Sequence, residues 1–171
     1  MIVELVHPDS DTKPRHWVRH DQAFAMMLRP GSIEWGTKRA ALEKFNYVAG
    51  DLALCDRHQG EWVGLMNVEH LQLGVSDAAL LASSDGAYGE VELRYSRKFA
   101  DARLSAMVAA VHAEMLAGFP SGRLFLDSVE QAMAVALVGG HAIRRRPVQI
   151  SRGGLGPARS LRRLRWLRCA R

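Results

Sequence analysis

Histidines are the residues of this sequence with the chemistry to bind a metal ion. The candidates are His16, His20, His58 and His70, and three histidines with a carboxylate on neighbouring strands would form a transition-metal site. No His-x-His pair occurs anywhere, although that spacing would place two rings on one face of a strand. We therefore predict that these histidines lie on the surface or in loops, and that the protein holds no metal and no other cofactor.

Aromatic and basic side chains in the same half of the chain are candidates for an organic ligand pocket. Such a pocket needs apolar walls and a few placed polar groups. The candidate ligand-binding residues are Arg15, His16, Trp17, His20, Trp35, His58 and Trp62. The alternative is that the aromatic residues simply fill a core, as buried aromatic side chains commonly do. We expect a small-molecule effector, whose chemical class the sequence does not name.

The sequence gives little support for an enzyme. Nucleophilic catalysis needs a serine, cysteine or threonine beside a base and a third group that orients it, and no such motif occurs. Cys55 and Cys169 lie far apart, outside any zinc or redox spacing. Asp127 and Glu130 are expected to lie on a helix face as solvated charges. We predict that the chain is not an enzyme and has no catalytic residues.

The basic residues are unevenly distributed. Residues 142–171 carry ten arginines and no acidic residue, whereas residues 1–141 carry thirteen basic and eighteen acidic residues. A basic segment can neutralise nucleic-acid phosphates in a salt-sensitive way that ignores base sequence. The candidate contacts are Arg159, Arg162, Arg163 and Arg165. Sequence-specific readout would need a scaffold that holds a helix in the major groove, so we expect non-specific binding at most.

A region of short strands must position the candidate ligand residues. Residues 1–98 contain short stretches in which apolar residues alternate with others, separated by turn residues. Phe24, Met26 and Leu28 form one such stretch, and Val91, Leu93 and Tyr95 form the last. This period of two is typical of antiparallel strands, and many short strands predict a small barrel or jelly roll.

From Asp101 the apolar period becomes that of a helix. Gly118 and Pro120 end the first helix, Ser121 caps a second, and Gly139-Gly140 closes it. The apolar stripes are Leu104, Met107, Val108, Val111 and Met115 on the first helix and Phe125, Leu126, Val129 and Met133 on the second. Such an antiparallel hairpin either covers the sheet or offers its stripes to a partner chain. We predict that these residues contribute to a homodimer.

Three stretches of the sequence resemble the AraC family of bacterial transcription regulators. Residues 50–54, Gly-Asp-Leu-Ala-Leu, followed by Arg57-His58, resemble a turn and strand of its sensor barrel. Residues 127–132 with 135–137 resemble its second dimerisation helix. Residues 152–159, Arg-Gly-Gly-Leu-Gly-Pro-Ala-Arg, resemble the entry into its DNA-binding domain. The three stretches occur in the family's order.

The resemblance implies a mainly β fold with α-helices, in which a cupin-like double-stranded β-helix or jelly-roll barrel precedes an antiparallel helical hairpin. It implies a ligand-sensing barrel, a dimerisation hairpin, a linker and the remnant of a first DNA-binding helix or an out-of-frame basic tail, at residues 1–98, 99–140, 141–157 and 158–171. After Arg159 the sequence departs from the family pattern, so we expect a regulator truncated before its helix-turn-helix units. DNA is a partner of the full-length family.

The alternative is a stand-alone small cupin enzyme or metal-binding protein, which would need a bound divalent ion. Counting from Gly50, the second cupin motif would place its proline at Asp56, its glycine at His58 and its histidine at Glu61. Since both halves of the metal signature fail, we favour the regulator. The N-terminal residues 1–7 are too short and too polar for a signal peptide or a membrane span, so we expect a cytoplasmic protein that contacts no membrane.

Overall fold

The computed structural model describes residues 1–8, 13–18, 22–55, 60–84 and 91–143. The predictions made for His20 and His58, and those for the segment 158–171, lie outside the described residues. The latter include the four candidate nucleic-acid contacts, Arg159, Arg162, Arg163 and Arg165. Within the described part, strands come first and the two long helices follow, as the change of period at Asp101 predicts.

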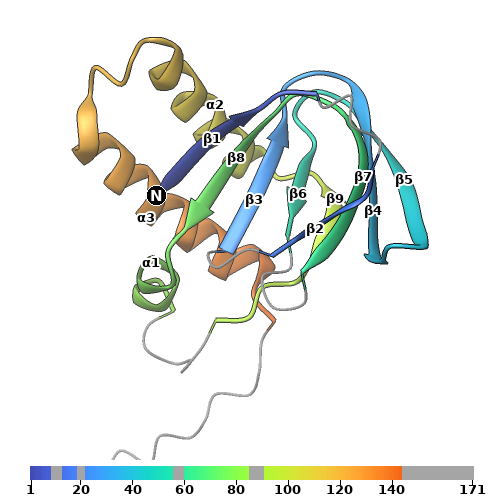
Figure 1. The fold of residues 1–171 in the computed structure, drawn as a ribbon. Helices are drawn as coiled ribbons and strands as arrows, with labels where there is room; N and C mark the ends of the chain where they lie inside the picture. The colour runs from blue at the N-terminus through green and yellow to red at the C-terminus, as the bar shows by residue number, and fades with distance from the viewer. Residues whose placement is uncertain (9–12, 19–21, 56–59, 85–90, 144–171) are drawn as a thin grey trace, which may run out of the picture.

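The strands of the described residues form two sheets in which every neighbouring pair is antiparallel (Figure 1). The five-stranded sheet has the order β1 (Ile2–Val6), β8 (His70–Val75), β3 (Gln22–Met27), β6 (Leu52–Leu54) and β9 (Ser96–Phe99). The four-stranded sheet has the order β2 (Arg15–Trp17), β7 (Glu61–Asn67), β4 (Gly31–Lys38) and β5 (Ala41–Tyr47).

The pairing follows one rule. β1 pairs with β8, β2 with β7, β3 with β6, and β4 with β5. The first half of the strand region therefore lies antiparallel to the second half, like one long folded ribbon. Alternate pairs of this ribbon fall into different sheets, where β3·β8 and β4·β7 contacts join them. The chain consequently forms two facing sheets rather than a row of hairpins.

The alternation along β3 explains why both faces of the five-stranded sheet are buried. Phe24 and Met26 point to a cluster shared with the helices, whereas Ala23, Ala25 and Met27 belong to a second cluster between the sheets. Successive side chains of a strand point to opposite faces, so apolar residues at every position require cover on both sides. The helices supply that cover on one side and the four-stranded sheet on the other.

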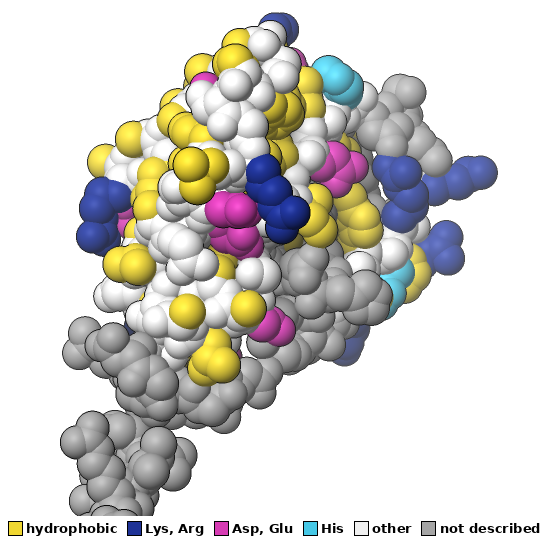
Figure 2. Space-filling model, turned by 90° about the vertical axis from the view of Figure 1, so that its left-hand side faces the viewer, with side chains coloured by type: hydrophobic (Ala, Val, Ile, Leu, Met, Phe, Trp, Pro, Cys, Tyr) yellow, Lys and Arg dark blue, Asp and Glu magenta, His cyan; other side chains and the backbone are white. Residues whose placement is uncertain are grey.

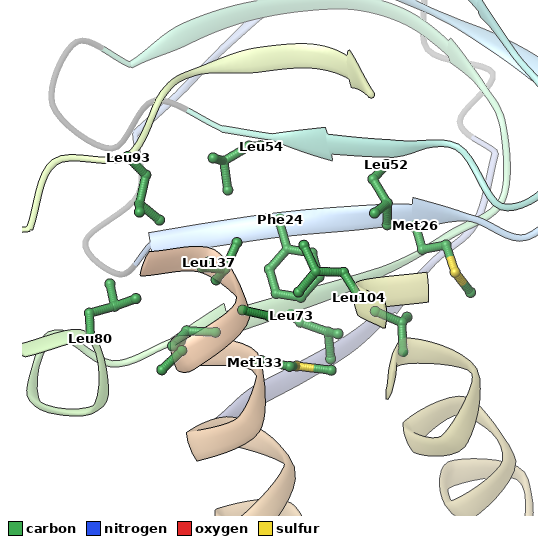
Figure 3. Packing of buried hydrophobic residues seen from close by; sticks show 14 of the residues in the cluster. Phe24, Met26, Leu52, Leu54, Leu73, Leu80, Leu93, Leu104, Met133 and Leu137 are labelled. Carbon is green, nitrogen blue, oxygen red and sulfur yellow. The ribbon is translucent and has the colours of Figure 1, made fainter. Parts of the chain in front are cut away.

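Three helices lie in the described residues: α1 (Asp77–Ala82), α2 (Ala102–Leu116) and α3 (Gly122–His141). Figure 1 shows α2 and α3 on the side of the five-stranded sheet that faces away from the four-stranded sheet. In Figure 3, Phe24 of β3 lies among Leu104 of α2 and Leu137 and Met133 of α3. These side chains are fully buried. None of the described helices is long and apolar enough to span a membrane.

The ends of α2 and α3 agree in part with the ends that the sequence predicts. Asp101 caps α2 by accepting hydrogen bonds from the backbone N–H groups of Arg103 and Leu104 at 2.9 and 3.2 Å, and Gly118, with φ +77°, follows its last turn. Ser121 precedes α3 but does not cap it, because its hydroxyl donates to Glu114 Oε1 at 2.9 Å. The predicted end of the second helix at Gly139-Gly140 is wrong, since α3 continues to His141.

The last predicted strand is also shifted. Val91, Leu93 and Tyr95 lie outside β9, and only Leu93 makes an isolated bridge, with Ala142. The chain leaving α3 reinforces this bridge, because Arg94 N donates to His141 O at 2.7 Å and Ile143 N donates to Glu92 O at 2.8 Å. The start of the predicted linker 141–157 is therefore fastened to the strand region.

Candidate functional site

A pocket opens where the edges of the two sheets meet. Its walls come from the end of β1, from β2 and from β7, and β1 and β2 are each the first strand of their sheet. The lining residues are Val6, His7, Pro8, Arg15, His16, Trp17, Val63 and Met66. The cavity volume of about 420 Å³ lies within the range of about 300–1,000 Å³ that small-molecule sites occupy.

The pocket has an apolar floor and a basic rim. Val63 and Met66 are buried, and Val6 and Trp17 pack against the same cluster between the sheets. His7, Arg15 and His16 are exposed. Such a combination suits an organic molecule that buries an apolar part and presents a polar part to the rim.

The strand register explains how the candidate ligand residues divide. Arg15 is opposite Val63 and Trp17 is opposite Glu61, whereas His16 is opposite Trp62. Residues directly opposite each other share a face of the sheet. Arg15 and Trp17 therefore lie on the side of Val63, and the His16 ring lies 5.1 Å from the Trp62 ring.

The structure thus brings together three of the seven candidate ligand residues in the pocket, Arg15, His16 and Trp17. Trp62 borders His16 without lining the pocket, and the guanidinium of Arg39 lies 5.8 Å from its ring centre. Trp35 is buried in the cluster between the sheets, where its Nε1 donates to Tyr47 Oη at 3.0 Å. The alternative interpretation as core packing therefore describes Trp35 better.

Sequence reasoning missed the other half of the pocket. Val6, His7 and Pro8 come from the first strand and its end, and Val63 and Met66 come from a strand far along the chain. No local pattern marks them, because their proximity depends on which sheet edges meet. The short strand β2 alone carried a visible signal, since three bulky or basic residues are consecutive there.

A buried polar network lies at the other end of β2. Tyr95 Oη donates to the buried carboxylate of Glu61, Arg97 Nε donates to Tyr95 Oη, and Arg97 lies 3.7 Å from Glu61. Burial raises the pKa of Tyr47 to about 12 and also raises that of Tyr95, whose phenol donates to Glu61. Both phenols therefore remain protonated donors at neutral pH: Tyr95 donates to Glu61, and Tyr47 donates to the Arg97 carbonyl oxygen at 2.8 Å.

His70, the fourth histidine considered for a metal, is neither a surface nor a loop residue. It lies on β8, fully buried, with Nδ1 3.4 Å from the carbonyl oxygen of Val68. The prediction of a surface or loop position is wrong for His70, because β8 is covered on both sides. In the part of the chain that the structure describes, no three His, Cys, Asp or Glu side chains are grouped so that they could hold a metal ion.

The predicted dimerisation stripes cover the sheet of their own chain. Leu104, Val108, Val111 and Met133 are fully buried in the cluster that includes Phe24. The remaining stripe residues are partly buried against that cluster: Met107, Met115, Phe125, Leu126 and Val129. Of the two roles considered for the stripes, covering the sheet is the one the structure displays, and the four buried residues offer no side-chain surface to a partner.

The outward face of the helical pair carries a second, different stripe. On α2 the exposed residues Ala102, Ala106, Ala109, Ala113 and Leu116 are spaced four, three, four and three apart. On α3, Leu124 and Val135 are 79% and 60% exposed. Figure 2 looks onto this helix-bearing side, where hydrophobic side chains interrupt the polar surface at several points. We call the seven residues the outer stripe.

Glu130 on α3 corrects another expectation. Its side chain is not a solvated charge: Oε2 lies 2.9 Å from the N-terminal ammonium of Met1, and Oε1 accepts from Ser76 N at 2.9 Å. Burial acts to raise its pKa, but these hydrogen bonds outweigh burial and hold the pKa below its usual value. Asp127 is exposed, as expected, with Oδ2 3.5 Å from Arg123 Nε.

Comparisons with known proteins assign no family. No family model matches the sequence, and no curated protein matches it. Among solved structures, the chain is similar to apo ToxT from Vibrio cholerae, with 10% identity and a TM-score of 0.49. The match covers 78% of this chain and 52% of that one, so this chain spans about half the length of that protein. A likeness at this level assigns neither family nor function.

Proposed function

We propose that this chain is the ligand-sensing and dimerisation part of an AraC-type transcription regulator. The observation that carries the proposal is that one fold holds a ligand-sized pocket and, separately, a helical pair with an exposed apolar stripe. A pocket lies at the open edge of a two-sheet body, and two helices seal the outer face of one sheet while leaving a second stripe exposed. The order of these parts agrees with the order of the first two resembling stretches, in residues 50–54 and 127–137, and the third, residues 152–159, lies outside the described residues.

The finer description of the fold supports the same proposal. Eight strands paired as one folded ribbon, with alternate pairs in different sheets, fit a jelly-roll barrel of the cupin-like kind. The helices α2 and α3 contact each other across a short turn and serve as the antiparallel hairpin of such a regulator. β9 forms a ninth strand beside this barrel and leads directly into α2.

The dimer contact is assigned to the outer stripe. Small residues at alternating spacings of four and three let two helices approach closely along one seam. Leu116 on α2 and Leu124 and Val135 on α3 add exposed apolar area to the helical pair, where burial against a second copy contributes about 25 cal/mol per Å². A homodimer formed in this way leaves the sheet-covering stripes where they are.

A reporter assay in cells tests this function. The whole chain is fused to a DNA-binding domain that represses only as a dimer, and we expect repression. Ala109→Glu places a charge in the outer stripe and should abolish repression. Ala41→Glu, the same change at an exposed alanine on β5, is the matched control and should repress normally. Equal repression by both variants, or none by the parent fusion, would refute the proposal.

A further inference from the structure

We infer that the pocket between β1 and β2 binds a compact uncharged molecule that is apolar over most of its surface and keeps any polar atoms at the open rim. The inference names the effector class for the function proposed above and rests on it only for the biological role. Binding itself is argued from the pocket alone.

The inward-facing wall of the pocket is apolar. Val63 and Met66 are buried at its floor and contribute aliphatic and thioether surface. Val6 and Trp17 pack against the cluster between the sheets but are only partly buried by the protein itself. A ligand that covers this surface removes apolar area from water, which is the main favourable contribution to binding in such sites.

The three basic side chains at the rim already have neighbours within the protein. Arg15 is exposed and interacts with another group of the chain. His7 Nδ1 lies 4.0 Å from Glu69 Oε1. The His16 ring lies 5.1 Å from the Trp62 ring, on the face of the strand pair opposite to Arg15. None of the three is therefore a buried cation that only a ligand could neutralise.

A charged group on the ligand would gain little from this rim. Ion pairs at exposed side chains are weakened by water and salt, and an anion at Arg15 would compete with the group that Arg15 already contacts. A cation would meet one guanidinium and two imidazoles, and none of the described lining residues carries a carboxylate. A charge of either sign would therefore lose hydration without a matching partner.

The described residues also contain no buried polar side chain that waits for a ligand. Within the described ranges, every buried side-chain nitrogen or oxygen has a hydrogen-bond partner in the protein. Sites that select a polar substituent place unpaired polar groups inside the pocket for it. Recognition here consequently depends on shape and apolar contact, and the volume of about 420 Å³ accommodates one compact molecule.

A pair of fluorescent probes tests the inference on the full chain. N-Phenyl-1-naphthylamine is uncharged, and 8-anilinonaphthalene-1-sulfonate has the same ring skeleton with one sulfonate. We expect the neutral probe to bind saturably, at one site per chain, with an affinity that does not weaken as salt is raised. The anionic probe should bind no more tightly than the neutral one, and Arg15→Gln should leave the affinity for the neutral probe unchanged.

Substitutions locate the site. Val6→Trp fills the pocket and should weaken the neutral probe about tenfold or more. Val48→Trp, the same change at an exposed valine outside the lining, is the matched control and should have no effect. Ala109→Glu, in the outer stripe, should also leave the affinity unchanged, which distinguishes the pocket from adsorption to the helical pair. Circular dichroism shows whether each variant is folded.

A smaller substitution decides the matter if Val6→Trp does not fold. In a Cys169→Ser background, Val6→Cys introduces a thiol into the pocket, whereas Cys55 is buried. The neutral probe should slow the reaction of the introduced thiol with an uncharged maleimide. It should not slow the reaction of a thiol introduced by Val48→Cys.

The outcomes separate the inference from the proposed function. Three results overturn the inference even where the reporter fusion represses: a neutral probe that does not saturate, tighter Arg15-dependent binding of the anionic probe, or neutral-probe binding that neither blocks the thiol at position 6 nor responds to a folded Val6→Trp variant. Pocket-dependent binding of the neutral probe together with a fusion that fails to repress leaves the site standing and removes the proposed regulator.

Discussion

The two faces of the five-stranded sheet differ in what fills them. The face toward the helices carries large side chains such as Phe24, Leu52 and Leu71, all fully buried. The inner face carries the small residues Ala23, Ala25 and Ala53 beside Met27, and most of the large residues of that cluster belong to the other sheet. The helix-covered face is sealed, whereas the inner space opens at the β1 and β2 edges into the pocket. Stability and ligand binding are therefore expected to respond to different substitutions.

The largest effect is expected on the helix-covered face. Phe24→Ala removes an aromatic side chain from the centre of that cluster and should lower the free energy of unfolding by about 3–5 kcal/mol. Val63→Ala, on the pocket floor, should cost about 1–2 kcal/mol, because fewer atoms are lost and the space adjoins an existing pocket. Urea unfolding measures both values. Equal losses would contradict the contrast between the two faces.

Glu130 tests how α3 is held to the strand region. Glu130→Gln replaces a buried charge that binds the N-terminal ammonium and Ser76, and should cost about 2 kcal/mol at neutral pH. Since the pKa of Glu130 is lower in the folded protein, its contribution is present above the unfolded value and is lost as pH falls through the folded value. The variant and the parent should therefore converge in stability in acid.

A matched control sits on the same helix. Asp127 is exposed and pairs with Arg123 at the surface, where such pairs contribute little. Asp127→Asn should change neither the urea midpoint at neutral pH nor its dependence on pH. A Glu130→Gln variant as stable as the parent at neutral pH would show that the buried contacts of Glu130 contribute nothing net.

A smaller effect is expected on DNA binding, which depends on the difference in charge between residues 1–141 and residues 142–171. The arginines that follow Pro157 in this segment should bind duplex DNA weakly at low salt, without preference between promoter and random sequence, and the affinity should fall steeply as salt rises. Removing the residues after Pro157 should abolish the binding. Filter binding over a salt series measures this, and a footprint at one site that survives physiological salt and competitor DNA would contradict it.

The smallest signal is expected from the transition-metal content of the purified protein. We expect purified protein to contain far less than one transition-metal ion per chain, because the sequence lacks a His-x-His pair and Glu61 occupies the place of the second motif's histidine. Elemental analysis measures the content. One ion per chain, removed by chelators with loss of structure, would favour the cupin metal-binding alternative.

Local patterns predicted β3 and the two long helices of this fold. The alternation around Phe24 gave β3, and the period from Asp101 gave α2 with its cap. The same patterns identified the side chains of α2 and α3 that would be buried, but not what would cover them. Both a sheet and a partner chain accept an apolar stripe, so the choice depends on packing that no single helix encodes.

Contacts between residues far apart in the sequence could not be predicted either, because they depend on how the elements pack. Arg15, His16 and Trp17 are consecutive, so sequence reasoning found them, whereas His7 and Val63 join them only through strand pairing. The prediction that Glu130 is solvated was wrong because its partner is the first residue of the chain, which no pattern along the helix reveals. The outer stripe was missed because alanines on a helix carry no strong apolar signal in a sequence.

Sedimentation equilibrium of two neighbouring variants of α2 tests the central claim most directly. Val108 is fully buried against the sheet and Ala109 is exposed in the outer stripe. At about ten micromolar, a concentration at which interfaces with a Kd near ~1 μM are mostly occupied, we expect the parent chain to be a dimer. We expect Ala109→Glu to be a folded monomer and Val108→Glu to unfold. A monomeric parent chain, or an Ala109→Glu variant that stays dimeric, would contradict the account.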